Sequence, residues 1–167
     1  GTQTCVVYKL AGKQLRMSAA AVFSSYADYK LPNGGYLSDS RMNDMGGKLK
    51  LGYNSGKWNF ELNYLYSNSE VGIPGHTHDL NPAPESFMLD EQDRDFSLPY
   101  QKIQNHFGNF KASYFINAKN KMEFFVNHGY NNLAEFEEKI YTPGIDMYLN
   151  SSSVQARYHW NPNKNLK

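Results

Sequence analysis

The chain has 167 residues, which is enough for one domain, and its net charge of +1 gives no electrostatic sign of a nucleic-acid partner. Its one cysteine, Cys5, allows neither an internal disulfide nor a thiolate metal site, and no apolar run reaches the roughly 18 residues of a transmembrane helix. Thirteen tyrosines and an aromatic content of 15% are typical of β-strands and of the aromatic girdles of outer-membrane barrels. The mean hydropathy of −0.68 is compatible with such a barrel, because the lumen and the loops keep the average polar.

A two-residue alternation of apolar and polar side chains predicts seven strands. In chain order they cover residues 3–10, 14–27, 45–54, 57–68, 104–116, 121–131 and 147–160. The fourth is the clearest, because its polar residues share one parity and its apolar residues share the other, namely Trp58, Phe60, Leu62, Tyr64 and Tyr66. About eleven residues at roughly 3.3 Å each is the length that a tilted strand needs to cross a bilayer.

The charged residues of these strands fall on the polar parity, which holds Arg16, Lys48, Lys50, Glu61, Lys111, Glu123 and Arg157. A lysine or arginine that faced lipid near the bilayer midplane would cost about 2–4 kcal/mol, so the segregation favours a membrane sheet. A soluble, half-buried sheet also alternates, but its strands are typically about 5–6 residues long. Three apolar residues, Leu65, Phe115 and Phe125, interrupt the polar parity and are expected to pack on a plug or on each other.

The connections between the predicted strands alternate between short and long. The short ones, at 11–13, 54–56, 117–120 and 161–165, carry the Gly, Asn and Pro residues of hairpin turns, and the long ones cover 28–44, 69–103 and 132–146. This alternation is typical of outer-membrane barrels, whose periplasmic turns are short and whose extracellular loops are long.

An open sheet edge cannot face lipid, because its backbone donors and acceptors would stay unsatisfied. Seven strands therefore indicate either a small closed barrel of about eight strands or a segment of a larger barrel. We predict the segment: an all-β fold, an antiparallel transmembrane β-barrel meander, with residues 1–167 as a partial barrel domain.

Three segments within about the first 80 residues follow one another in a particular order and spacing. Residues 24–33, Ser-Ser-Tyr-Ala-Asp-Tyr-Lys-Leu-Pro-Asn, run from a strand into a loop, and residues 47–53, Gly-Lys-Leu-Lys-Leu-Gly-Tyr, belong to the return strand. The tyrosine-rich strand then leads into residues 69–75, Ser-Glu-Val-Gly-Ile-Pro-Gly. In these respects the chain resembles the early barrel of TonB-dependent outer-membrane receptors.

The resemblance implies a location in the outer membrane and a barrel of about 22 strands, closed by an N-terminal plug domain that would lie upstream of Gly1. Such receptors import a scarce ligand, such as a ferric siderophore or another chelate, with energy relayed through the TonB complex. The partners that it implies are outer-membrane lipid, the imported ligand and, through the plug, TonB. A chain without the plug is expected not to transport anything alone, and no cofactor is expected.

The long loop at 69–103 is the first place to expect ligand binding, because loops on a rigid scaffold commonly carry function. His76 and His78, with the neighbouring Asp79, could ligate a transition metal, and the acidic cluster at 90–95 contributes Asp93 and Arg94 as ligand-binding candidates. A solvated extracellular loop explains the same residues without any ligand.

The loop at 28–44 carries two further candidates. Tyr36 could contact a ligand at the barrel mouth, and Arg41 suits bidentate capture of a carboxylate or phosphate. A loop held only by the turn geometry of residues 33–35 is the alternative for both.

The sequence holds no nucleophile elbow, phosphate-binding loop or zinc-protease helix, so we predict that the chain is not an enzyme. Serine, histidine and aspartate all occur, but a catalytic triad is defined by geometry rather than by composition. Two alternatives to a transporter segment stay open: a soluble β-barrel module that binds a ligand, and a small outer-membrane barrel enzyme.

Overall fold

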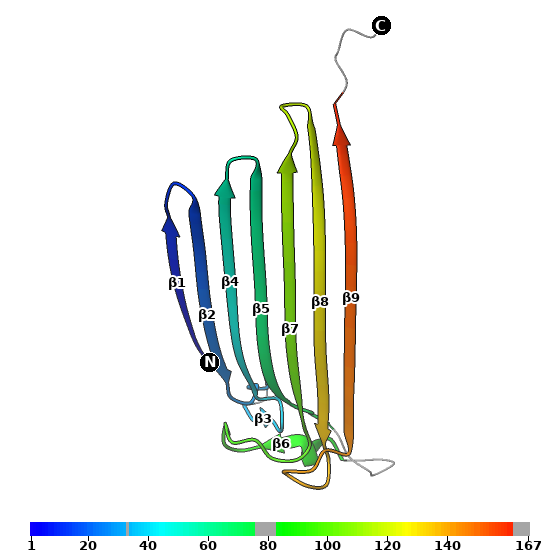
Figure 1. Cartoon of the computed structure of the whole chain (residues 1–167). Helices are drawn as coiled ribbons and strands as arrows, with labels where there is room; N and C mark the ends of the chain where they lie inside the picture. The colour runs from blue at the N-terminus through cyan, green and yellow to red at the C-terminus, as the bar shows by residue number, and fades with distance from the viewer. Residues whose placement is uncertain (33, 76–82, 162–167) are drawn as a thin grey trace, which may run out of the picture.

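The computed structural model of the protein describes residues 1–32, 34–75 and 83–161, and this part of the chain is all-β (Figure 1). Seven long strands form one antiparallel sheet, in which each strand pairs with its neighbours along the chain. In sheet order they are β1 (Thr2–Ala11), β2 (Leu15–Tyr26), β4 (Met42–Ser55), β5 (Trp58–Gly72), β7 (Tyr100–Phe115), β8 (Asn120–Phe136) and β9 (Ile145–Trp160). The predicted all-β, antiparallel meander of seven strands is confirmed.

Four strands extend at least three residues further towards the long loops than the sequence predicts. In the structure β4 begins at Met42 and β7 begins at Tyr100, whereas β5 ends at Gly72 and β8 ends at Phe136. The alternation is lost in these extensions, because polar residues such as Glu70 and Lys102 take the places where apolar residues would continue it. The backbone ladder continues regardless, since its hydrogen bonds need no particular side chain.

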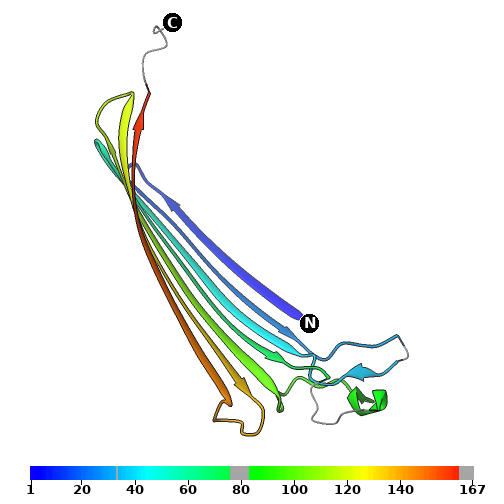
Figure 2. The same cartoon turned by 90° about the vertical axis from the view of Figure 1, so that its right-hand side faces the viewer.

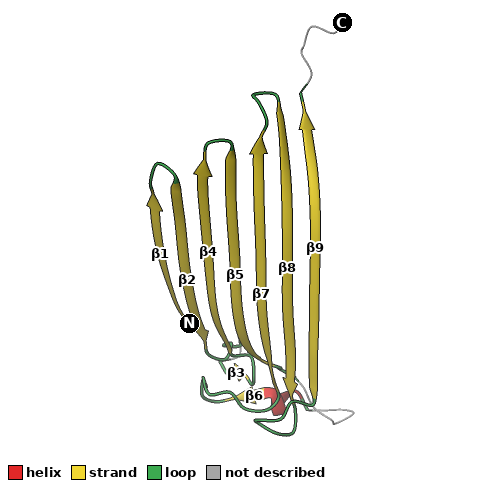
Figure 3. Ribbon diagram, viewed as in Figure 1, coloured by secondary structure: helices red, strands yellow, loops and turns green. Residues whose placement is uncertain are grey.

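The long loops contain short elements that the sequence analysis did not predict. β3 (Tyr36–Leu37) pairs with β6 (Met88–Leu89), and a short 3₁₀ helix, η1 (Pro84–Phe87), precedes β6. Figure 3 shows these pieces gathered at the end of the sheet where the long loops lie. Two-residue strands carry no periodic signal, so alternation could not reveal them. None of the helical turns in the described ranges has the length and apolar character needed to cross a membrane.

Figure 2, which views the sheet close to edge-on, shows a single layer of strands that bow along their length. The sheet is open in the described part of the chain, where β1 pairs only with β2 and β9 pairs only with β8. A buried apolar cluster lies at the long-loop end, where Tyr100, Ala134 and Phe136 pack with the partly buried Phe96 and Leu98. Elsewhere large apolar side chains are exposed, so the backbone ladders rather than a core hold most of the sheet together.

Gly72 joins the end of β5 to the loop before β4, and its amide donates to the carbonyl oxygen of Arg41 at 3.0 Å. A Cβ at position 72 would overlap the backbone carbonyl of Asp39, whereas a Cβ at Gly47 would lie 3.8 Å from the nearest carbonyl oxygen, that of Ala20. We therefore expect Gly72→Ala to lower the free energy of unfolding by about 1–3 kcal/mol, the usual range for overpacking.

Urea unfolding followed by tryptophan fluorescence measures this effect, and Gly47→Ala serves as the control with a small change. Equal midpoints for the two variants would show that the Asp39 backbone gives way without cost.

Candidate functional site

The register places the two parities of every strand on opposite faces of the sheet. One row of the apolar face crosses five strands, through Leu51, Leu62, Phe110, Val126 and Val154. These side chains are open to the surroundings, with Leu62 exposed by 40% and Val154 by 81%. The apolar face is therefore a continuous surface, and Trp58 and Tyr64, each 40% exposed, belong to it rather than to a sealed interior.

Two groups of aromatic side chains border this apolar face. The group at the short turns includes Trp58, which packs on Tyr114 with ring centroids 4.7 Å apart. The group towards the long loops includes Tyr66, His106 and Tyr130, with centroid distances of 5.0 and 5.7 Å along the row. The eight residue-to-residue steps from Trp58 to Tyr66 span about 26 Å at roughly 3.3 Å each.

The strip between the two aromatic groups contains no Asp, Glu, Lys or Arg on its face of the seven strands. On the last four strands its two rows nearest Trp58 hold Phe60, Leu62, Phe110, Ala112, Phe124, Val126, Val154 and Ala156, and one more row, of Tyr64, Gly108, His128 and Ser152, lies before Tyr66. Charge returns on this face only beyond the aromatic group, where Lys102 pairs with Glu70 at 2.8 Å. Apolar side chains bordered by aromatic rows at this separation match the outer surface of a membrane barrel.

The opposite, polar face carries the charged residues of the strands, as their parity predicted. Glu123 accepts contacts from Lys111 at 3.1 Å, Lys121 at 3.0 Å and His159 at 2.6 Å, although its own side chain is only 6% exposed. Phe125, expected to pack on a plug or on another apolar side chain, instead lies beneath cations, with the Arg157 guanidinium 4.9 Å from its ring centroid and the Lys111 ammonium 5.6 Å away. Cation–π contacts of this kind let an aromatic ring occupy a charged face.

Side-chain amides on the polar face bond to one another across the strands. Asn63 donates to Asn109 at 3.1 Å, Asn109 to Asn127 at 2.5 Å, and Asn127 to the Ser153 hydroxyl at 3.0 Å. We call this row the long ladder. A parallel row, the short ladder, joins Asn131 to Asn105 at 2.7 Å and Asn105 to Ser67 at 3.2 Å.

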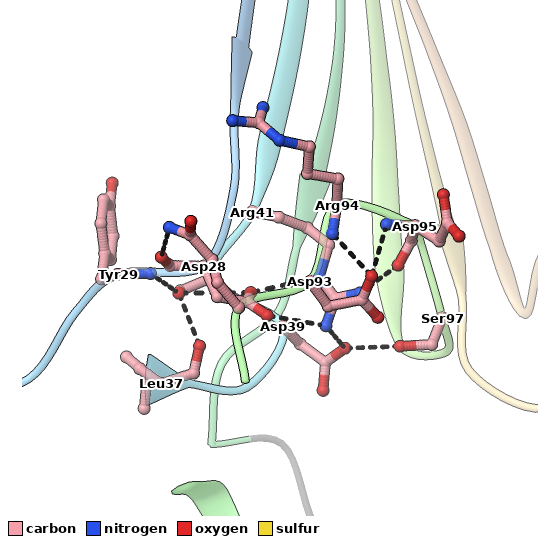
Figure 4. A network of polar contacts seen from close by, with 11 residues as sticks. Asp28, Tyr29, Leu37, Asp39, Arg41, Asp93, Arg94, Asp95 and Ser97 are labelled. Atoms are coloured by element: carbon pink, nitrogen blue, oxygen red, sulfur yellow. Dashed lines mark hydrogen bonds and ion pairs between the residues drawn. The ribbon is translucent and has the colours of Figure 1, made fainter. Parts of the chain in front are cut away.

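The long loops are organised around Arg41, which is 2% exposed (Figure 4). Its guanidinium forms a two-pronged ion pair with Asp28, through Nε at 3.1 Å and Nη2 at 3.1 Å, and Asp28 itself is 1% exposed. Nη1 contacts a carboxylate oxygen of Asp93 at 2.8 Å and donates to the backbone carbonyl of Asp95. One buried cation therefore joins the loop at 28–41 to the loop at 93–95.

The Asp93 carboxyl completes this network from the second loop. The backbone amides of Asp95 and Arg94 donate to one of its oxygens at 3.0 and 2.6 Å, and Arg41 contacts the other. Together these donors hold the pKa of Asp93 below its usual value of 3.8. The carboxylate is thus charged at neutral pH and positioned by three separate groups.

The structure brings some of the predicted ligand-binding residues together and leaves others apart. Arg41 and Asp93 are in contact, so the carboxylate partners of Arg41 come from the chain itself, as Figure 4 shows. Arg94 is next to them, but its side chain extends away and reaches only the Ser25 hydroxyl, at 3.5 Å. Tyr36 pairs with Leu89 through β3 and β6, and it is partly exposed.

The predicted metal ligands, His76 and His78, and the neighbouring Asp79 lie outside the described residues. Within the residues that are described, no group of three or more His, Cys, Asp or Glu side chains is arranged to hold a metal ion.

Sequence reasoning missed Asp28 and Ser40, the buried partners of the Arg41 network. The Ser40 amide donates to Asp28 at 3.0 Å, and the Ser40 hydroxyl accepts from the Tyr29 amide at 2.8 Å. The sequence signal for this network was that two polar residues, at positions 39 and 40, directly precede an arginine. The residues that bond to them lie too far away along the chain for residue spacing to reveal them.

Comparison of the chain with protein-family models, with curated proteins and with solved structures found no match. The arrangement of the two faces and of the loops is therefore the basis for assigning a function. The family resemblance, the ligand-binding roles of the loop residues and the absence of enzymatic activity stay predictions.

Replacing Arg41 tests whether one buried cation holds the loops together. Arg41→Met leaves the buried Asp28 carboxylate without a counter-charge, and breaking such a pair costs about 3–5 kcal/mol. We expect faster cleavage after Glu91 by a glutamyl endopeptidase, while the far-UV circular dichroism of the sheet is unchanged. Arg94→Met is the matched control, because this exposed arginine makes only a peripheral contact; equal cleavage of both variants would contradict the role of Arg41.

The Asp93 network also predicts a dependence on pH. Because the pKa of Asp93 is lowered by folding, its stabilisation of the loops is complete above pH 3.8 and is lost as the pH falls through the lower, folded-state value. Hydrogen exchange of residues 90–97, corrected for the intrinsic rate, should accelerate in the natural chain as the pH falls below 3.8. Asp93→Asn should lack this part of the acceleration, and the same pH dependence in both proteins would assign it to another group.

Proposed function

We propose that this chain is part of the wall of a transmembrane β-barrel in an outer membrane, and that the barrel imports a scarce ligand in the manner of TonB-dependent receptors. The exposed, charge-free apolar strip between two aromatic groups is the observation that carries the proposal. A surface of this extent needs an apolar environment, and its span of about 26 Å along the strand suits the hydrocarbon layer of a membrane.

The two open edges favour a larger barrel over a complete small one. β1 and β9 each leave one side of their backbone unpaired in the described chain, and hydrocarbon cannot satisfy those donors and acceptors. Further strands must therefore lie against both edges in a membrane. This need supports the segment of a barrel of about 22 strands that the sequence resemblance implies.

An importing role fits the remaining surfaces. The polar face would line the lumen, and the loops joined through Arg41 would lie at its outer mouth, where Tyr36, Asp93 and Arg94 could meet a ligand. Energy from TonB would reach the barrel through a plug domain. A ferric siderophore or another chelate is the proposed cargo, on the strength of the family resemblance alone.

Vesicle flotation tests the membrane assignment. The chain, diluted from urea into phospholipid vesicles, should float with the lipid and gain β-structure by circular dichroism. A detergent-free, monodisperse monomer would overturn the proposal and favour a soluble ligand-binding module.

Two adjacent positions on β9 give a depth-matched test of which face meets lipid. Val154 lies on the apolar face, and Gln155 lies next to it on the polar face. We expect Val154→Lys to weaken insertion by about 2–4 kcal/mol, the usual cost of a lysine facing lipid near the midplane, and Gln155→Lys to have little effect. The fraction of folded protein bound to vesicles across a urea series measures both, and equal losses would show that the faces are not distinguished by lipid.

A further inference from the structure

The polar face contains an apolar strip between its two amide ladders. The register row through Lys48, Leu65, Phe107, Gly129 and Ser151 lies between the long ladder and the short ladder. Leu65 and Phe107 are 41% and 47% exposed, so they form an accessible apolar floor on an otherwise polar surface.

A hollow of about 340 Å³ opens over this strip, lined by Leu65, Phe107, Lys48 and the long-ladder residues Asn63, Asn109 and Asn127. The space exists because Gly129 and Ser151 bring almost no side chain to the row. A Cβ at Gly129 would lie 3.2 Å from the Phe107 ring and 3.2 Å from the Ser151 hydroxyl. A second hollow, of about 280 Å³, is lined by Arg16, Lys50 and Glu61 and shares Asn63 with the first.

In the part of the chain that the structure describes, the cations beside the two hollows form no ion pair with a carboxylate. Lys48, Lys50 and Arg16 form no ion pair within the described ranges, in contrast to Lys111 and Lys121 at Glu123. Glu61 lines the second hollow together with Arg16 and Lys50, and the register sets it beside Lys111. With three cations and one carboxylate, this end of the strip therefore presents net positive charge.

The side-chain amides of the two ladders are held in fixed orientations and keep hydrogen-bonding groups that a ligand could use. In the long ladder Asn63 uses one N–H donor, Asn109 and Asn127 each use one donor and one acceptor position, and an amide has two of each. The spare donors and acceptors lie on both sides of an apolar floor. Fixing their orientation before binding reduces the entropy lost when a ligand arrives.

We propose that this strip binds an acidic oligosaccharide, a chain of uronate sugars. The apolar C–H face of a sugar ring lies on Phe107 and Leu65, and its hydroxyls exchange hydrogen bonds with the amide ladders. The uronate carboxylates meet Lys48 and Lys50. The strip can bind such a ligand in any setting, but its place in an import route rests on the proposed function, under which the polar face lines a lumen.

Binding of tetragalacturonate to the detergent-solubilised chain, measured by titration calorimetry, tests the proposal. We expect saturable binding that weakens with salt, and at least about tenfold weaker binding of the neutral maltotetraose. Binding of maltotetraose as tight as that of the uronate, or no binding of the uronate by folded chain, would overturn the proposal.

Two independent variants locate the site. Lys48→Gln combined with Lys50→Gln removes the cations, and Gly129→Val fills the hollow without changing charge. Each should weaken uronate binding by about tenfold or more, while Lys13→Gln, which removes a cation from a short turn, should leave it unchanged. Circular dichroism checks that each variant is folded, and uronate binding that is unaffected by both variants would place the ligand elsewhere.

Flotation of the same preparations keeps this inference separate from the proposed function. A chain that floats with vesicles but does not bind the uronate overturns the saccharide site alone. A chain that binds the uronate but stays soluble supports the site and overturns the membrane role.

Discussion

Hydrogen bonding between backbones is the interaction on which this structure depends. The described chain forms a single layer, so few side chains are buried, and seven paired strands take the place of a conventional core. Because the ladder asks little of the side chains, the two faces are free to differ completely in chemistry. In the membrane setting that we propose, the same ladder would be strengthened, since hydrocarbon offers the backbone no competing partners.

The two faces of the sheet and the loops at its end differ in their chemistry. The strip between the aromatic groups carries no formal charge, whereas the polar face concentrates cations around Glu123 and beside the amide ladders. At the long-loop end of the sheet, the buried ion pair between Arg41 and Asp28 holds the loops together, as backbone hydrogen bonds hold the strands together. Because this pair is so fully removed from water, losing either partner would leave a buried charge unpaired. The pair therefore fixes how the loops meet rather than adding generally to stability.

Much of the fold could be predicted from the sequence, because alternation acts within each strand and needs no knowledge of its neighbours. The segment from Trp58 to Tyr66 shows this well, because the period of two identified both the strand and its exposed apolar face. The strand extensions at Glu70 and Lys102 were missed, because only backbone pairing, and not the alternation of side chains, maintains them. The contacts of Arg41 with Asp28, Asp93 and Asp95, and those of the amide ladders, join residues 13 to 54 positions apart along the chain, which only the register and the loop paths bring together. Phe107 was not predicted as a binding residue for the same reason, because the space over its ring depends on Gly129, which lies beside it on the next strand.

The direction of the two outermost strands has a consequence for assembly. β1 and β9 point the same way, as the arrowheads in Figure 1 show, because an odd number of strands alternates between them. Copies of this sheet placed edge to edge would therefore meet along parallel seams rather than continuing the up-and-down order. Any wall that preserves that order around a complete circuit must contribute an odd number of additional strands, so the arithmetic of orientation disfavours a ring made from this unit alone.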